Sequence, residues 1–257
     1  MRGFALGAAT FAALLGGCDL VFQVDARDER IDEDLDGIPN VRDNCPGIAN
    51  RGQEDTGEDV ALAVPDGVGD NCDPEVDDPG DAIVATYFFT DPANDPTGWQ
   101  VEGPWQFEDN FVEVDARNTV AKLIIPPLAQ VYQRTTMEAG FELIDLGTGF
   151  FSACTDFDTR CVEVRAGAPP ELTVINGTTE VDGSDPITVA LPSRVVLQLR
   201  RTVANATELT DLKGFIRNLN DVDKSGDAQS GADSKSAFVV VDHAWVRLHH
   251  VVIYGVR

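Results

Sequence analysis

Acidic side chains recur at short, regular intervals between Asp32 and Asp43. The stretch opens with the pattern D-x-D-x-D-G, in which Asp32, Asp34 and Asp36 precede Gly37. In a tight metal-binding loop, carboxylates at positions 1, 3 and 5 project inward, and the sharp turn at position 6 requires glycine. Hard divalent cations prefer oxygen ligands of this kind. The pattern therefore predicts a calcium-binding loop.

The remaining positions of this loop also carry oxygen donors. Ile38 at position 7 would coordinate through its backbone carbonyl, Asn40 at position 9 directly or through water, and Asp43 at position 12 would close the shell. Glu33 occupies an alternate position and is expected to point outward. Asp43 stands where an EF-hand loop has glutamate. A solvated acidic tether without a fixed metal is the alternative interpretation.

The sequence that follows resembles the thrombospondin type 3 repeat. The resemblance rests on Asp43-Asn44-Cys45-Pro46, on Asn50, Gln53 and Asp55, and on Asp66-Gly67-Val68-Gly69-Asp70-Asn71-Cys72-Asp73. Such repeats have almost no core; they wrap around calcium ions and are cross-linked by disulfides. The resemblance implies first-site ligands at Asp32, Asp34, Asp36, Asn40 and Asp43, and second-site ligands at Asp55, Asp66 and Asp73.

The second site departs from the repeat pattern. Extra residues around Thr56 to Pro65 interrupt the run, so Leu62 and Val64 fall where carboxylates belong. Glu58 or Asp59 would have to take their place. We expect ions and a disulfide, rather than buried apolar area, to hold this segment together. Removal of calcium should then loosen it without affecting the domain that follows.

The charge of the chain supports a cation-binding function. The formal net charge is −25, and 20 acidic but only four basic residues lie between Asp19 and Asp81. A nucleic-acid partner requires clustered Lys and Arg and is therefore excluded. So dense a negative charge needs counterions to remain compact.

The N-terminus indicates export. An apolar run from Phe4 to Leu15 follows Met1-Arg2 and is too short to span a bilayer. It ends in Leu15-Gly16-Gly17-Cys18, which resembles the bacterial lipobox. The resemblance implies a signal peptide over residues 1–17 and a tether over residues 18–30 that begins at a lipidated Cys18. The protein would be anchored outside the cytoplasm, at the outer membrane or cell surface. An ordinary signal peptide or a short buried helix ending in cysteine is the alternative.

The four other cysteines are even in number and lie in a compartment that permits disulfides. Four cysteines allow three pairings, and only Cys45–Cys72 with Cys154–Cys161 keeps each pair within one proposed module. These pairs are the prediction. A zinc site is the alternative, although the wide spacings are not typical of one.

After the acidic segment, which we assign to residues 31–81, residues 82–257 have an all-β pattern. Apolar and polar residues alternate, and Gly, Pro, Asn and Asp turns separate the stretches. No amphipathic helix is predicted, and Ala204 to Phe215 would form at most a turn or two. The pattern favours a two-sheet antiparallel sandwich. The expected strands are Ile83–Phe89, Trp105–Val114, Ala121–Ile125, Gln133–Leu143, Phe150–Cys154, Arg160–Arg165, Leu172–Asn176, Ile187–Ala190, Arg194–Thr202, Phe238–Val241 and Ala244–Val256.

The final stretch, Ala244 to Gly255, resembles the closing strand of concanavalin A-like (laminin G-like) jelly rolls. Gly98-Trp99, Gly103-Pro104-Trp105 and the Val195-Leu197-Leu199 alternation support that resemblance. Leu248 and Val251 are an odd number of residues apart, which would place them on opposite faces of the strand. We therefore expect a β-bulge near His249 and His250.

Catalytic groups are not evident. Sandwich glycosidases need two carboxylates close together on one strand, and Glu113-Val114-Asp115 begins such a pattern without completing it. His249 and His250, as strand neighbours, should point to opposite faces and so could not share an ion. Trp99 and Trp105 could stack on sugar rings or lie in the core.

The sequence thus predicts a calcium-binding, lipid-anchored module for adhesion or carbohydrate binding and no enzyme. Its expected partners are calcium, the membrane and a glycan or another surface protein. A structural spacer of the cell envelope is the main alternative, followed by a glycan-active enzyme.

Overall fold

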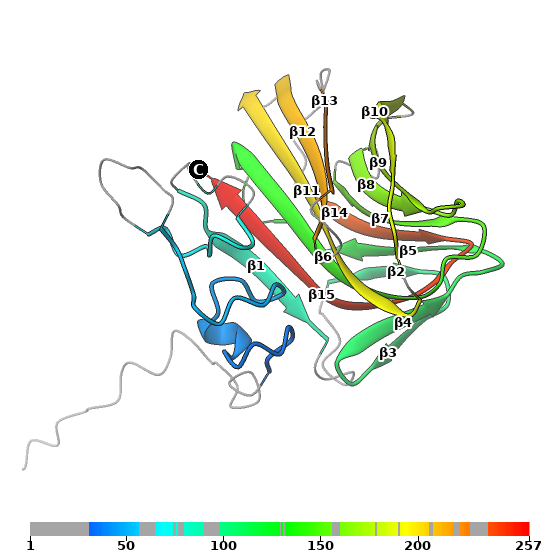
Figure 1. Cartoon of the computed structure of the whole chain (residues 1–257), viewed down its shortest axis with the longest axis horizontal. Helices are drawn as coiled ribbons and strands as arrows, with labels where there is room; N and C mark the ends of the chain where they lie inside the picture. The colour runs from blue at the N-terminus through cyan, green and yellow to red at the C-terminus, as the bar shows by residue number, and fades with distance from the viewer. Residues whose placement is uncertain are drawn as a thin grey trace, which may run out of the picture.

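The computed structural model describes most of the chain beyond residue 30. The described residues are 31–56, 65–73, 76, 80–89, 98–128, 130, 132–155, 160–177, 179–189, 191–205, 208–217, 222–226 and 236–256. They form two antiparallel sheets packed face to face, preceded by an irregular segment (Figure 1). The all-β, two-sheet sandwich predicted from the sequence is confirmed.

The eight strands of the first sheet, sheet A, follow the order β13-β12-β11-β6-β15-β4-β3, and β1 pairs with β15. Their bounds are β1 Ile83–Phe88, β3 Trp105–Glu108, β4 Phe111–Asp115, β6 Arg134–Asp145, β11 Ser193–Asn205, β12 Glu208–Arg217, β13 Val222–Gly226 and β15 Trp245–Val256.

The seven strands of the second sheet, sheet B, follow the order β10-β9-β8-β7-β14-β5-β2. Their bounds are β2 Gln100–Glu102, β5 Val120–Ile125, β7 Phe150–Thr155, β8 Arg160–Arg165, β9 Glu171–Asn176, β10 Thr179–Pro186 and β14 Ala237–Asp242.

The main core lies between the sheets, because alternate residues of each strand point inward. Phe141 of β6 and Phe151 of β7 meet there with ring centroids 4.8 Å apart. Leu197 and Leu199 of β11 are fully buried in the same cluster. Complete burial of each such side chain stabilises the fold by roughly 1.5–3 kcal/mol.

The β-bulge predicted in the last strand is confirmed. The register between β15 and β6 shifts between Leu248 and His250, so His249 is the extra residue. As a result Leu248 and Val251 are both buried in the main core. The bulge also corrects one prediction: His249 and His250 both lie on the outer face of sheet A, rather than on opposite faces.

Several strand predictions were wrong at polar or glycine-rich stretches. The single strand predicted over Trp105–Val114 is the hairpin β3–β4, whose turn places Asn110 at φ 76°; asparagine tolerates this conformation. The stretch expected to form at most a helical turn is largely strand β12. There Gly214 allows close approach of the sheets, since a Cβ at this position would lie 2.4 Å from Val174 Cγ2.

The strand predicted over Ile187–Ala190 is also misplaced. The structure instead forms β10 over Thr179–Pro186, which pairs with β9. The acidic and glycine residues of this stretch have low β-propensity, so tertiary pairing determines its conformation. Strands β2 and β13 were not predicted at all.

The acidic segment packs on the outer face of sheet A, beside β1 and β15 (Figure 1). Its Ile48 and Val68 form a second apolar cluster with Val252 and Tyr254 of β15, and all four side chains are buried. The expectation that buried apolar area contributes little to the stability of this segment is therefore wrong. Sheet A supplies the core that the segment lacks by itself.

Candidate functional site

The first predicted loop brings three carboxylates together. Oxygen atoms of Asp32, Asp34 and Asp36 lie within 4.8 Å of one another. Gly37 has φ 97°, as the sharp turn requires, and its N–H donates to Asp32 Oδ2 at 2.9 Å. The Ile38 N–H donates to Asp36 Oδ1 at 2.7 Å. These backbone bonds hold the three side chains toward one point.

Two carboxylate oxygens in this loop are buried without a hydrogen-bond partner. Asp34 Oδ2 and Asp43 Oδ2 find no hydrogen-bond partner among the described residues. Burial, followed by the neighbouring charges of Asp43, Asp36 and Asp32, raises the pKa of Asp34 from 3.8 to about 7, although the Asp36 N–H opposes this. Burial also raises the pKa of Asp43. A buried carboxylate without a partner is costly, and a cation would remove that cost.

The donor set fits calcium better than a softer metal. All the carboxylates present hard oxygens, and described histidine and cysteine side chains do not join the group. Asn40 is buried beside the loop, and its amide oxygen accepts the Glu33 N–H at 2.9 Å. Asp43, Asn40 and the Ile38 carbonyl remain the predicted completion of the shell.

A second carboxylate group differs from the predicted one. The structure brings Asp66 and Asp73 within 4.8 Å of Asp81, a residue that the sequence pattern did not include. Asp55 is not part of this group, and its Oδ2 accepts the Gly67 N–H at 3.1 Å. Asp81 also forms an ion pair with Arg134 of β6 at 3.0 Å. Asp81 lies after the last residue of the repeat-like pattern, so that pattern could not identify it as a member of this group.

Both predicted disulfides are present. Cys45–Cys72 lies in the apolar cluster under the acidic segment, and Cys154–Cys161 joins neighbouring strands β7 and β8. The first bond closes the loop that carries Asp66 of the second carboxylate group. Loop closure of this kind stabilises mainly by restricting the unfolded chain.

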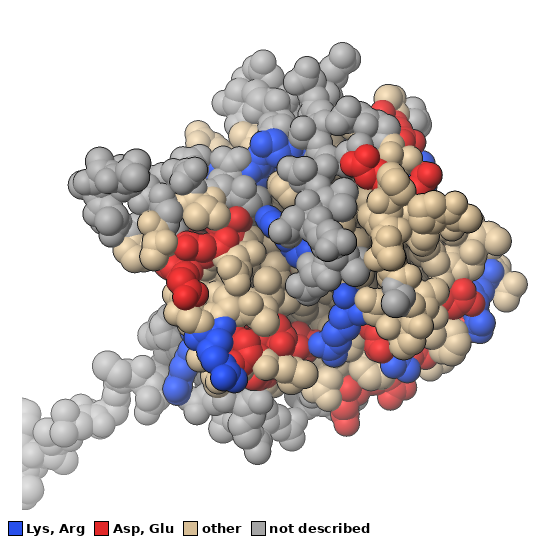
Figure 2. All heavy atoms as spheres, viewed as in Figure 1, with Lys and Arg blue, Asp and Glu red and all other residues tan. Residues whose placement is uncertain are grey.

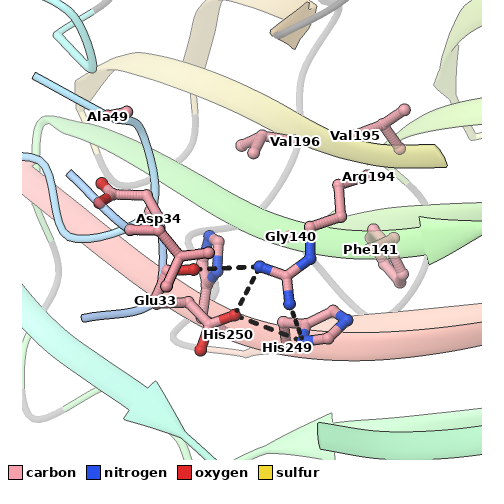
Figure 3. Close-up of a pocket in the computed structure, with 12 residues that line it drawn as sticks. Glu33, Asp34, Ala49, Gly140, Phe141, Arg194, Val195, Val196, His249 and His250 are labelled. Atoms are coloured by element: carbon pink, nitrogen blue, oxygen red, sulfur yellow. Dashed lines mark hydrogen bonds and ion pairs between the residues drawn. The ribbon is translucent and has the colours of Figure 1, made fainter. Parts of the chain in front are cut away.

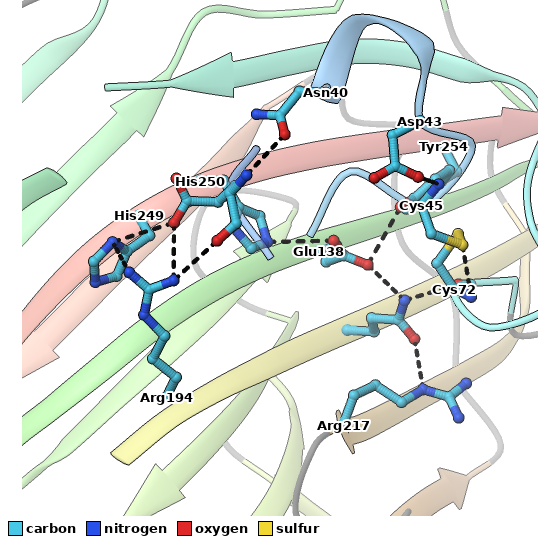
Figure 4. Close-up of polar contacts among 12 residues, drawn as sticks. Asn40, Asp43, Cys45, Cys72, Glu138, Arg194, Arg217, His249, His250 and Tyr254 are labelled. Carbon is cyan, nitrogen blue, oxygen red and sulfur yellow. Dashed lines mark hydrogen bonds and ion pairs between the residues drawn. A yellow bond between two sulfur atoms is a disulfide. The ribbon is translucent and has the colours of Figure 1, made fainter. Parts of the chain in front are cut away.

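Beneath the acidic segment lies a buried polar network (Figure 4). Glu138 of β6 is fully buried, and Gln198 Nε2 donates both to its Oε2 and to the Cys72 carbonyl, each at 2.8 Å. Tyr254 donates its hydroxyl to the same Oε2 at 3.3 Å. Burial, followed by the Glu138 charge, raises the pKa of Tyr254 well above its usual value. Gln198 thus ties the segment directly to sheet A.

The segment approaches the sheet closely at Gly47. A Cβ on Gly47 would lie 2.2 Å from His250 Nε2 and 2.6 Å from Glu138 Oε1. The His250 ring in turn lies over Gly140 of β6, where a Cβ would be 2.1 Å from His250 Cε1. Two glycines therefore make room for one buried histidine.

A pocket of about 210 Å³ lies along this seam between the segment and sheet A (Figure 3). Arg194 of β11 donates to the Glu33 carbonyl at 3.0 Å and to His249 Nδ1 at 3.1 Å. Glu33 Oε1 lies 3.3 Å from both Arg194 Nη1 and His249 Nδ1. Glu33 is not part of the first carboxylate group, and docking on sheet A gives its side chain two basic neighbours.

The residues considered for carbohydrate chemistry have other roles here. Glu113 pairs with Arg247 at 2.6 Å, and Asp115 pairs with Arg117 at 2.7 Å. Trp105 is buried in the main core, and its indole N–H donates to the Glu102 carbonyl at 3.1 Å. Trp99 packs edge-on against Tyr87. Both tryptophans therefore contribute to packing.

Cys18, the signal peptide, the tether, Glu58 and Asp59 lie outside the described residues. Within the described part of the chain, no helix is long and apolar enough to cross a membrane.

In the space-filling view, Asp and Glu side chains gather over the acidic segment, with Arg side chains at its margin (Figure 2).

Comparison with known proteins identifies the class of fold. No family model and no curated protein sequence matches the chain. Among solved structures, the CBM2 module of the Lactobacillus casei BL23 phage J-1 evolved Dit has a TM-score of 0.50 and 9% identity, covering 69% of this chain and 96% of that one. The legume lectin-like domain from Entamoeba histolytica has a TM-score of 0.50 and 10% identity, covering 68% and 99%. The described sandwich is thus a concanavalin A-like, legume lectin-like jelly roll.

Proposed function

We propose that this chain is a calcium-binding lipoprotein, anchored to a bacterial membrane outside the cytoplasm, that presents its sandwich to bind carbohydrate. One observation carries the proposal most directly. A group of carboxylates with uncompensated buried oxygens is docked on the face of a lectin-like sandwich. The cation would be held by Asp32, Asp34, Asp36 and Asp43.

Calcium would act structurally and electrostatically in this arrangement. It would neutralise the repulsion among the four carboxylates and so keep the loop closed against sheet A. The resemblance to the thrombospondin type 3 repeat supports calcium as the ion. At the second group, Asp66, Asp73 and Asp81 are the corresponding candidate ligands.

Carbohydrate binding is supported by the fold alone. A legume lectin-like domain shares the two-sheet architecture, and lectins are by definition sugar-binding proteins. This is an analogy between folds, since function depends on the site. The lipobox-like sequence at Cys18 supports the membrane anchor, and residues 18–30 would then place the sandwich away from the bilayer.

Binding of the full chain to a glycan array, with calcium and with a chelator, tests this proposal. We expect binding to a subset of glycans in calcium and weaker binding after chelation. Absence of binding in both conditions would favour a structural spacer of the cell envelope. Hydrolysis of a polysaccharide by the purified protein would instead favour the glycan-active enzyme.

A further inference from the structure

The seam pocket has a lining that neither the acidic segment nor the sandwich provides alone. The segment contributes Glu33, Asp34 and Gly47, and sheet A contributes Gly140, Arg194 and the two bulge histidines (Figure 3). Leu35 and Ala49 are exposed at its margin. The pocket exists only where the loop of the first carboxylate group packs on β6, β11 and β15.

Buried polar atoms line this pocket without hydrogen-bond partners among the described residues. Both ring nitrogens of His250 are in this state; Nε2 lies 3.3 Å from Glu138 Oε1 but is not aligned for a hydrogen bond. His249 Nε2 is also without a partner and lies 3.6 Å from Glu142 Oε2. His249 and His250 are only 6% and 3% exposed. Buried groups of this kind require a partner, which can be water, an ion or a bound polar molecule.

The direction of the available hydrogen bonds follows from Arg194. A guanidinium group only donates, so His249 Nδ1 must accept from it, and the hydrogen of the neutral ring is then on Nε2. His249 therefore offers a donor, and the two unpartnered ring nitrogens of a neutral His250 offer one donor and one acceptor. A ligand that fits both must donate and accept within a short span, as the vicinal hydroxyls of a sugar do.

We propose that the seam pocket binds one unit of a neutral saccharide. This rests on the proposed carbohydrate-binding function and locates it on the outer face of sheet A. The volume of about 210 Å³ is smaller than the roughly 300–1,000 Å³ of drug-sized sites, which suits a single ring. The carboxylate of Glu33 already pairs with the guanidinium of Arg194 at 3.3 Å, so an acidic sugar is disfavoured.

The chain offers an internal control for a direct test. It has three histidines, and His243 precedes β15 at the far end of the strand from the segment, half exposed to solvent. The histidine Cε1–H NMR signals of the calcium-loaded full chain would be followed during titration with neutral methyl glycosides and with methyl glucuronoside. We expect the His249 and His250 signals to shift with a neutral glycoside and the His243 signal to stay in place.

A pair of substitutions tests the location independently. Ala49→Phe places an aromatic ring at the pocket margin without removing a polar group. Val120→Phe adds the same ring at an exposed position on sheet B. The first change should weaken glycan binding at least about tenfold, or 1.4 kcal/mol, and the second should not. Unchanged thermal unfolding of both variants shows that folding is preserved.

The outcomes separate the two proposals. Glycan binding that survives Ala49→Phe and shifts none of the seam histidines would overturn the seam site while leaving carbohydrate binding intact. Stronger binding of the glucuronoside than of any neutral glycoside would overturn the assigned sugar class. If the wild-type chain binds no saccharide on the array or in the titration, both proposals are wrong.

Discussion

At the scale of single residues, the first carboxylate group has opposite effects on stability with and without a cation. Asp34 has a pKa raised to about 7, so its charge opposes folding at neutral pH when no metal is bound. Asp34→Asn should therefore stabilise the metal-free protein slightly and weaken calcium binding at least about tenfold. Thermal unfolding and titration calorimetry measure the two effects.

Asp70→Asn is the matched control, because Asp70 belongs to neither carboxylate group and accepts hydrogen bonds from Thr56. It should leave calcium binding at the first site almost unchanged. Equal loss of binding in the two variants would show that total charge, rather than the ligand geometry proposed here, determines affinity.

At Gly47 the absence of a side chain allows the segment to dock. Gly47→Ala should lower the free energy of unfolding by about 1–3 kcal/mol, since the added Cβ meets the buried His250 ring. Gly52→Ala is the control, because there the new Cβ meets only the exposed Glu54 carboxylate, which can move. Faster tryptic cleavage at Arg42 and Arg51 in the first variant alone would support this interpretation, and equal cleavage rates would contradict it.

At the scale of elements, sheet B contains a buried acid on β8 with a predictable response to pH. Burial raises the pKa of Glu163 from 4.5, although Arg165 opposes this and Glu180 and Asp242 add to it. The protonated form of Glu163 therefore favours folding. Its contribution to the free energy of unfolding is lost as the pH rises from 4.5 through the raised pKa. Glu163→Gln has no such loss. Urea unfolding across this range should show the variant gaining stability relative to wild type as the pH increases; parallel curves would contradict the assignment.

The elements also show what the sequence could predict. Alternating apolar stretches such as those of β6, β11 and β15 predicted strands, because one of their faces packs in the main core. The bulge followed from the odd spacing of Leu248 and Val251. Strands β10 and β12 were missed, since polar residues and Gly214 obscure their alternation and pairing with neighbours determines their conformation.

At the scale of the whole molecule, the sequence pattern located the first carboxylate group but could not show where it docks. Local spacing identified Asp32, Asp34 and Asp36, whereas Asp81 joins its group only through the folded chain. Glu138 and Gln198 were not singled out because a buried polar residue on a strand gives no sequence signal. Since the segment shares apolar contacts with β15, calcium removal should destabilise the sandwich as well as the segment.

The membrane anchor is a separate prediction for the whole molecule. Replacing Cys18 with serine should abolish incorporation of labelled palmitate and release the protein from the membrane fraction, because the thiol is the proposed acceptor of the lipid. Cys154→Ser, which removes one sulfur atom of the sandwich disulfide, should retain the label. Label retained in the Cys18 variant would exclude lipidation at this position.

Calcium titration of the full chain, combined with unfolding of the same samples, tests the central claim most directly. At a hundredfold excess over Kd, a ligand that binds only the folded form contributes about 2.7 kcal/mol. We expect saturable calcium binding. We also expect a single unfolding transition, monitored by the near-UV signal of the sandwich tryptophans, in which bound calcium raises the free energy of unfolding by this order. If the chain binds no calcium at millimolar concentration, or if the transition of the sandwich does not move, the acidic segment is not a calcium-dependent part of the fold.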